Sequence, residues 1–118
     1  SDFEKEHPFL LHAKLGAYIA KTKYNVADPE ILSAITYHTT GKPEMTMLEK
    51  IVYIADYIEP ARNKAPRLAE IRKLAFEDLD KCTKTILKNT IEYLTECGQE
   101  IDERTVKTYK YYKDKKEN

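Results

Sequence analysis

Hydrophobic residues recur along most of this chain at intervals of three and four positions, with charged residues between them. That spacing is typical of amphipathic helices rather than of strands. It predicts a first helix at about 8–23. The hydrophobic side of this helix is formed by Leu11, Leu15, Tyr18 and Ile19. Asp28 followed by Pro29 is a typical helix start, so a second helix is expected from Pro29 to about His38.

Four further helices are predicted from start and stop signals in the rest of the chain. The string Thr46-Met47-Leu48-Glu49 is a capping box, and Pro60 disfavours helix in the residue before it, so a helix is expected at 47–59. Asp102 can cap a last helix, and Gly98 is a typical stop for the helix before it. The other helices are therefore expected at 67–76, 78–97 and 103–113. The pattern as a whole predicts an all-α fold.

Length and charge narrow the function classes. A chain of 118 residues is expected to form one domain with a single core. Its 20 basic and 20 acidic residues give a formal net charge of zero, which argues against a large basic face for nucleic acid, although 107–116 is locally basic. No apolar run approaches the ~20 residues that a bilayer span needs. We therefore expect neither nucleic acid nor a membrane as a partner.

The two cysteines, Cys82 and Cys97, are too few and too far apart for a metal or redox motif. They are expected to be reduced thiols of a cytoplasmic protein. The chain starts at Ser1 without a methionine and leads almost at once into a helix. This start predicts a fragment of a longer protein or a processed chain.

Two histidines and one aspartate are candidate metal ligands. Asp56 lies within the hydrophobic run 47–58, where a buried carboxylate is costly unless it is paired or binds a cation. His38 ends a hydrophobic stretch, and His12 lies between Leu11 and Ala13. Such a set suits iron, zinc or manganese. The alternatives are a surface or paired carboxylate for Asp56, and for the histidines a favourable position at a helix C-terminus or a hydrogen-bonded core side chain.

Other polar residues have similarly open interpretations. Thr39, Gly41 and Lys42 offer the parts of a phosphate cradle, but without the spacing of a known phosphate loop, so a polar connection is the simpler interpretation. Arg62 could form two hydrogen bonds to a phosphate or could simply be exposed. Three tyrosines near the C-terminus could stack on a base, although we favour packing for at least one of Tyr109, Tyr111 and Tyr112.

Five strings of residues are the most specific motifs of the chain: Leu11-His12-Ala13, Leu15-Gly16-Ala17-Tyr18, Tyr37-His38-Thr39-Thr40-Gly41, Met45-Thr46-Met47-Leu48-Glu49-Lys50 and Tyr53-Ile54-Ala55-Asp56-Tyr57-Ile58-Glu59-Pro60-Ala61-Arg62. They closely resemble the YqeK family of bacterial HD-domain proteins, which are described as symmetrical bis(5'-nucleosyl)-tetraphosphatases. The resemblance continues through Ile71-Arg72-Lys73-Leu74-Ala75 to Thr105-Val106-Lys107-Thr108-Tyr109, and so covers nearly the whole chain.

The resemblance implies an all-helical HD fold with a two-metal site, usually of iron, with manganese or zinc as alternatives. It also implies hydrolysis of diadenosine tetraphosphate to two ADP. The metal ligands that carry over are His12, His38 and Asp56. Catalytic roles carry over to Asp56 and Arg62. Contacts to the dinucleoside polyphosphate or to ADP carry over to His12, His38, Thr39, Asp56, Arg62, Ile101, Asp102, Glu103, Arg104, Thr105 and Val106.

One departure from the family is large. The family also uses an N-terminal histidine and an adjacent His-Asp pair, and no His-Asp dipeptide exists in these 118 residues. The sequence is therefore expected to be a single HD-type helical domain over 1–118 that is incomplete at its N-terminus. Activity is expected only with the missing ligands present. A homodimer is compatible with the sequence.

Three other interpretations remain open at this point. Related HD enzymes hydrolyse guanosine alarmones, deoxynucleotides or cyclic dinucleotides. A metal-free interaction module that keeps the HD scaffold, or a purely structural bundle, would also explain a chain without the doublet. The structural bundle predicts no interaction among His12, His38 and Asp56.

Overall fold

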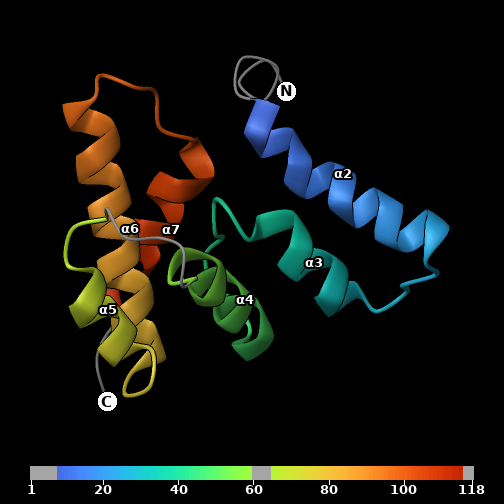
Figure 1. Cartoon of the computed structure of the whole chain (residues 1–118), viewed down its shortest axis with the longest axis horizontal. Helices are drawn as coiled ribbons and strands as arrows, with labels where there is room; N and C mark the ends of the chain where they lie inside the picture. The colour runs from blue at the N-terminus through green and yellow to red at the C-terminus, as the bar shows by residue number, and fades with distance from the viewer. Residues whose placement is uncertain (1–7, 60–64, 116–118) are drawn as a thin grey trace.

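The computed structural model describes residues 8–59 and 65–115, with side chains from Ala13 onward (Figure 1). Within these ranges the chain is helical and contains no strand. The helices are α2 (Pro8–Lys23), α3 (Pro29–Tyr37), α4 (Met47–Tyr57), α5 (Leu68–Leu74), α6 (Leu79–Glu96) and α7 (Glu103–Asp114). The predicted all-α fold is thus confirmed.

Three of the described helices, α3, α4 and α7, begin at the capping residues that the sequence indicates. At the start of α3, the Asp28 carboxylate accepts a hydrogen bond from Glu30 N at 2.8 Å. At the start of α4 both bonds of the predicted capping box are present, between Thr46 and Glu49. Because these bonds satisfy backbone N–H groups that the helix itself leaves unpaired, they fix where each helix starts.

Two helices, α4 and α5, end two residues earlier than predicted. The expected helix 47–59 ends at Tyr57, because Ile58 leaves helical geometry while its N–H still donates to Ile54 O. The expected helix 67–76 is only Leu68–Leu74. Arg67 has a left-handed φ of 59° and provides no side-chain cap. After α5 the backbone turns back, and Asp78 N donates to Leu74 O at 2.8 Å.

The hydrophobic core lies among α4, α5, α6 and α7. In Figure 1, α6 and α7 lie side by side, with α4 and α5 packed against α6. The core consists of Met45, Tyr53, Ile54, Ile71, Leu74, Cys82, Ile86, Leu87 and Tyr112. The partly buried Tyr109 and Tyr111 pack against it. The predicted packing role of these tyrosines is therefore confirmed.

The pair α2 and α3 stands apart from this core. Among the described helices, α2 contacts α3 alone, while α3 also packs on α4. The hydrophobic side predicted for the first helix is consequently uncovered in its described part. There Leu15 is 52% exposed, Tyr18 65% and Ile19 40%.

Cys82 is buried in the core and Cys97 is exposed, and both are free thiols, in line with the prediction. Within the described ranges, every helix is too short or too polar to cross a bilayer.

Candidate functional site

His38 follows the last residue of α3 and has a fixed ring orientation. Its Nδ1 lies 2.6 Å from the backbone oxygen of Ile35. A carbonyl oxygen can only accept, so Nδ1 carries the hydrogen and donates it. In the neutral ring this leaves the lone pair on Nε2. A backbone bond at one ring nitrogen that frees the other is the usual support of a metal-binding histidine.

The residues after His38 form a turn that packs against α7. Gly41 N donates to Tyr37 O at 2.8 Å, and Gly41 has a left-handed φ of 75°. The backbone oxygen of the buried Thr40 accepts a hydrogen bond from Thr105 Oγ1 at 3.1 Å. This bond joins the stretch after His38 to the start of α7, and so brings together two of the regions predicted to contact nucleotide.

Thr39 contributes an unusual polar atom to this turn. Its Oγ1 is buried and has no hydrogen-bond partner among the described residues. Buried hydroxyls are nearly always paired, and one without a partner costs free energy. The Thr39 hydroxyl next to His38 therefore has a hydrogen-bonding capacity that no described residue uses.

The predicted nucleotide-binding stretch 101–106 contains the start of α7. The Asp102 carboxylate accepts from Arg104 N at 2.8 Å, from Arg104 Nε at 3.0 Å and from an Arg104 terminal nitrogen at 2.7 Å. The Arg104 guanidinium is therefore held beside the helix start by a bidentate ion pair. Farther along α7, Tyr112 Oη accepts from Met45 N at 3.0 Å. Burial raises the pKa of this tyrosine to about 12, so it stays neutral.

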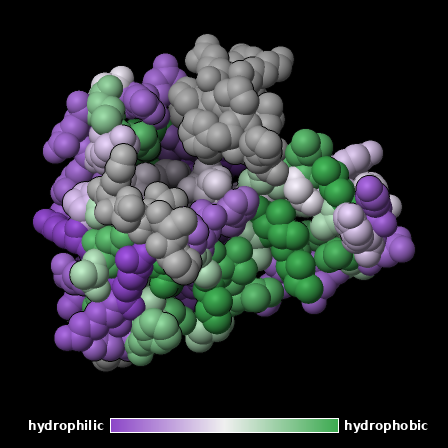
Figure 2. Space-filling model, viewed as in Figure 1, coloured by the Kyte–Doolittle hydropathy of each residue, from purple (hydrophilic) through white to green (hydrophobic). Residues whose placement is uncertain are grey.

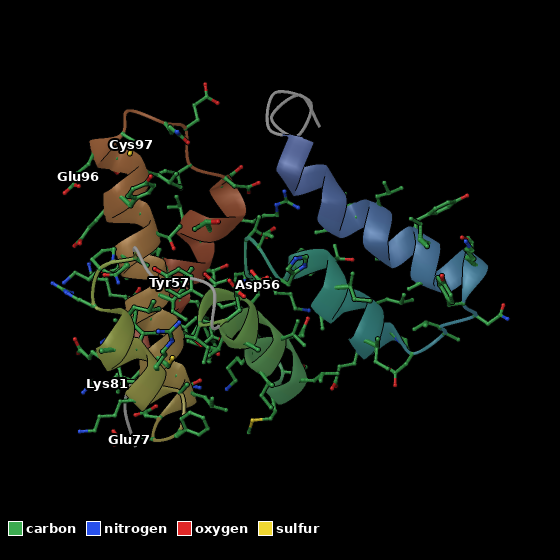
Figure 3. All side chains as sticks on the ribbon, in the orientation of Figure 1. Asp56, Tyr57, Glu77, Lys81, Glu96 and Cys97 are labelled. Carbon is green, nitrogen blue, oxygen red and sulfur yellow. The ribbon has the colours of Figure 1, made fainter. Side chains whose placement is uncertain are left out.

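Asp56 lies on the last turn of α4 and is exposed (Figure 3). The sequence left open a surface carboxylate or a buried one that is paired or binds a cation. The structure shows Asp56 at the surface, because Glu49, Tyr53 and Ile54 are the buried residues of α4. Burial raises the pKa of Tyr53, and the charges of Tyr57 and Asp56 raise it further. No hydrogen bond or ion pair joins Asp56 to another described residue. Its carboxylate is thus accessible to a ligand.

Two predicted site residues lie outside what the structure describes. Arg62 falls between the described ranges, and the side chain of His12 precedes the first described one. The backbone of His12 lies on α2, which packs on α3. Among the described side chains, no three His, Cys, Asp or Glu groups form a metal-binding cluster. The predicted ligands therefore remain predictions, and of the three only His38 and Asp56 have side chains that the structure describes.

The structure adds a buried carboxylate that the sequence indicated only as a helix cap. The Glu49 side chain is 1% exposed, and Lys42 Nζ lies 2.9 Å from its Oε2. Ser33 Oγ donates to the same oxygen, and Thr46 N donates to Oε1 at 2.9 Å. Burial acts to raise the pKa of Glu49, but these hydrogen bonds outweigh it and hold the pKa below its usual range. Lys42, predicted as part of a polar loop or a phosphate cradle, thus has a structural partner.

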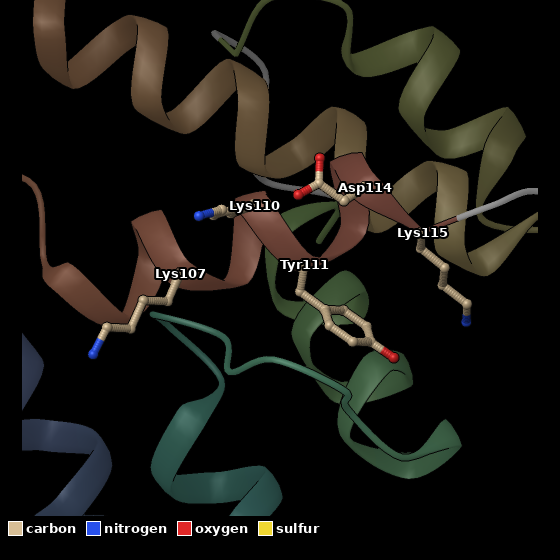
Figure 4. A pocket seen from close by; sticks show the side chains of 5 residues that line it. All are labelled: Lys107, Lys110, Tyr111, Asp114 and Lys115. Carbon is tan, nitrogen blue, oxygen red and sulfur yellow. The ribbon is translucent and has the colours of Figure 1, made fainter.

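A separate open pocket runs along α7 and includes none of the residues that the family resemblance assigns to the site, although it includes Tyr111, a candidate for stacking on a base (Figure 4). It is lined by Lys107, Lys110, Tyr111, Asp114 and Lys115. Lys115 pairs with Asp80 at 2.6 Å, and Lys107 pairs with Glu103 at 3.2 Å. The pocket therefore offers little uncompensated positive charge to an anion.

Comparison with known proteins finds relatives along almost the whole chain. The HD domain family matches residues 1–61. The symmetrical bis(5'-nucleosyl)-tetraphosphatase of Bacillus subtilis (strain 168) is 45% identical over 105 residues, covering 89% of this chain and 56% of the relative. The protein of the same name from Halalkalibacterium halodurans is 43% identical over 100 residues, covering 85% of this chain and 53% of the relative. The chain thus spans about half the length of these curated relatives.

A solved structure has the same fold. A protein from Clostridium acetobutylicum, described as a predicted HD superfamily hydrolase involved in NAD metabolism, superposes with a TM-score of 0.92 at 39% identity. The match covers 98% of this chain and 61% of that protein. The arrangement of helices described above is therefore shared with a solved HD hydrolase.

Proposed function

The chain belongs to the HD domain family, and on that premise we propose that it is part of a metal-dependent hydrolase that cleaves diadenosine tetraphosphate symmetrically into two ADP. The observation that carries this proposal is the likeness, along most of the chain, to relatives named symmetrical bis(5'-nucleosyl)-tetraphosphatases. The free thiols Cys82 and Cys97 support a reducing compartment such as the cytoplasm.

The donor set of this chain suits a divalent metal. His38 offers an Nε2 lone pair because its Nδ1 is committed to Ile35 O, and Asp56 offers an exposed carboxylate. In the proposal His12, His38 and Asp56 hold the metal, which is iron, with manganese or zinc as alternatives. When bound, such a metal activates water at neutral pH and offsets charge on phosphoryl oxygens.

The chain's own residues bind and orient the tetraphosphate. The buried Thr39 hydroxyl, which lacks a partner among the described residues, donates a hydrogen bond to a phosphoryl oxygen. Arg62 contributes charge that stabilises the transition state. The stretch 101–106 contacts the nucleotide, held beside Thr39 by the bond between Thr105 and Thr40. Water adds to a central phosphorus, the bond to the bridging oxygen breaks, and the two products are both ADP.

The test is turnover by the protein expressed from its complete gene. We expect diadenosine tetraphosphate to give ADP as the sole nucleotide product, in preference to guanosine alarmones, deoxynucleotides or cyclic dinucleotides. Asp56→Ala should abolish turnover, while Glu92→Gln, which changes an exposed carboxylate on α6, should not. AMP and ATP as products, near-normal activity of Asp56→Ala, or preference for another substrate would sink the proposal.

A further inference from the structure

Residues 38–46 connect α3 to α4 and contain His38 and Thr39, whereas Asp56 lies at the far end of α4. The proposed site therefore needs this connection to be held in one position relative to α4. We propose that Glu49 is a positioning residue, which fixes the connection through Lys42 and Ser33. This inference rests on the function proposed above. The Glu49 cluster is defined here as Ser33, Lys42, Thr46 and Glu49.

The first argument is that Glu49 has more partners than a helix cap requires. A capping box is complete with the two bonds between Thr46 and Glu49, and a glutamine at this position would satisfy it equally well. Glu49 in addition accepts from Ser33 on α3 and from Lys42 in the connection, both at Oε2. Its carboxylate therefore joins three segments: the middle of α3, the connection and the first turn of α4.

The second argument concerns burial. The Glu49 side chain is only 1% exposed, whereas Lys42 is 32% exposed. A carboxylate in that position is stable only if a cation and hydrogen-bond donors compensate the loss of water. Lys42 supplies that cation. The connection therefore cannot move away from α4 without leaving an uncompensated buried charge.

The third argument is that Lys42 also closes the turn that carries His38 and Thr39. Its Nζ lies 5.4 Å from the centre of the Tyr37 ring, a cation–π contact with the residue just before His38. Gly41 N donates to Tyr37 O across the same turn. Residues 38–41 are thus enclosed between Tyr37 and Lys42, and Glu49 anchors Lys42.

The experiment compares variants of the protein from its complete gene. Lys42→Met removes the cation, and Lys42→Arg restores it. The double variant Lys42→Met/Glu49→Gln removes both charges, so it avoids a buried unpaired carboxylate and folds even if Lys42→Met alone does not. The matched control is Lys50→Met. Lys50 is on α4, next to Glu49, and pairs at 2.8 Å with Asp80 on α6, so this variant removes an ion pair of α4 that does not involve the connection.

Two readouts separate positioning from general stability. The first is hydrogen exchange of the Gly41 amide, compared with the Leu87 amide in the core. The second is Mn²⁺ affinity, measured without substrate. For Lys42→Met and the double variant, we expect the exchange rate of the Gly41 amide, relative to wild type, to increase by a factor at least about ten times larger than that of the Leu87 amide. We expect Mn²⁺ affinity to fall about 10- to 100-fold, with recovery in Lys42→Arg and little change in Lys50→Met.

The outcomes are distinct from those that test the function itself. If Gly41 exchanges at the wild-type rate in the double variant, or if Lys50→Met weakens Mn²⁺ binding as much, the positioning role is wrong. If the wild-type protein binds no metal, the proposed function fails instead. In that case the Gly41 exchange alone decides whether the Glu49 cluster fixes the connection.

Discussion

At the scale of single residues, His38 and Asp56 differ in how firmly other groups hold them. The His38 ring is fixed by its bond to Ile35 O at 2.6 Å. Asp56 is exposed and has no hydrogen bond or ion pair with another described residue. Metal-binding side chains are usually oriented by hydrogen bonds from outside the ligand set. We therefore infer that His38 is oriented before a metal binds, whereas the orientation of Asp56 is set by binding.

Gly41 is a second residue for which the structure predicts the effect of a substitution on stability. It has a left-handed φ of 75°, and a Cβ added there would lie 3.0 Å from Thr108 Cγ2. Thr108 is fully buried, and its hydroxyl donates to Arg104 O, so it cannot easily move. Gly41→Ala should therefore combine backbone strain with overpacking and cost about 2–4 kcal/mol of unfolding free energy, measured by urea denaturation.

Gly98→Ala is the matched control for this substitution. Gly98 also has a left-handed φ, of 67°, but nothing lies within 4 Å of the added Cβ. Only backbone strain remains there, about 1–2 kcal/mol. Thr108→Ser, which removes Cγ2 and keeps the hydroxyl, should recover part of the stability of Gly41→Ala. Equal losses at Gly41 and Gly98 would mean that the turn does not pack tightly on α7.

At the scale of helices and loops, two buried or partly buried carboxylates on α4 and α6 link segments that are distant in sequence. Glu49 joins α3, the connection and α4, and Asp80 pairs with Lys50 on α4 and with Lys115 after α7. Burial acts to raise the pKa of Asp80, but the hydrogen bonds from Lys115 and Lys50 outweigh it and lower the pKa. Both carboxylates therefore have a lower pKa in the folded state than in the unfolded state.

This difference predicts acid sensitivity with a definite sign. A carboxylate with a lowered folded-state pKa stabilises the fold above its unfolded value, here 4.5 for Glu49 and 3.8 for Asp80, and that stabilisation is lost as the pH falls through the folded-state pKa. Unfolding free energies from urea denaturation at pH 7 to 3 should fall steeply below about pH 5. Glu49→Gln should flatten this dependence and Glu92→Gln should not; equal slopes in both variants would contradict the account.

The sequence predicted the helices well wherever a local signal sets their ends. Asp28 with Pro29 and the capping box at Thr46 depend only on neighbouring residues, so they could be read directly. The start of α5 could not, because Arg67 has a left-handed φ and no side-chain cap. There Asn89 Nδ2, from α6, donates to Pro66 O at 2.7 Å, a contact between residues 23 positions apart.

The same limit applies to the candidate site. Residue types and motifs identified His38, Thr39 and Asp56 as candidates. They did not identify the unpaired hydroxyl of Thr39 or the cation at Glu49, because both depend on how the connection folds against α4 and α7. The sequence also could not decide between a surface position and a buried one for Asp56, since a hydrophobic run in a sequence does not show which side of its helix is covered.

At the scale of the whole molecule, hydrophobic surface is distributed unevenly. Figure 2 shows hydrophobic side chains gathered over α3 and α4 in the middle of the view. On α2 the exposed Leu15, Tyr18 and Ile19 add to the uncovered hydrophobic surface. The core among α4 to α7 is by contrast closed, with Ile71, Ile86 and Leu87 fully buried. The best-buried part of the molecule is therefore the core among α4 to α7, whereas His38 and Thr39 of the proposed site follow α3, which packs on the less covered α2.

The most direct test of the central claim is the metal content of the protein expressed from its complete gene and purified without oxygen, measured by elemental analysis beside His38→Gln. We expect about two divalent metal ions per chain in the wild-type protein, by the two-metal chemistry of phosphoryl transfer, and a clear loss of metal in His38→Gln. A folded wild-type protein without metal, even after incubation with Fe²⁺ or Mn²⁺, or a His38→Gln variant with unchanged metal content, would contradict the account.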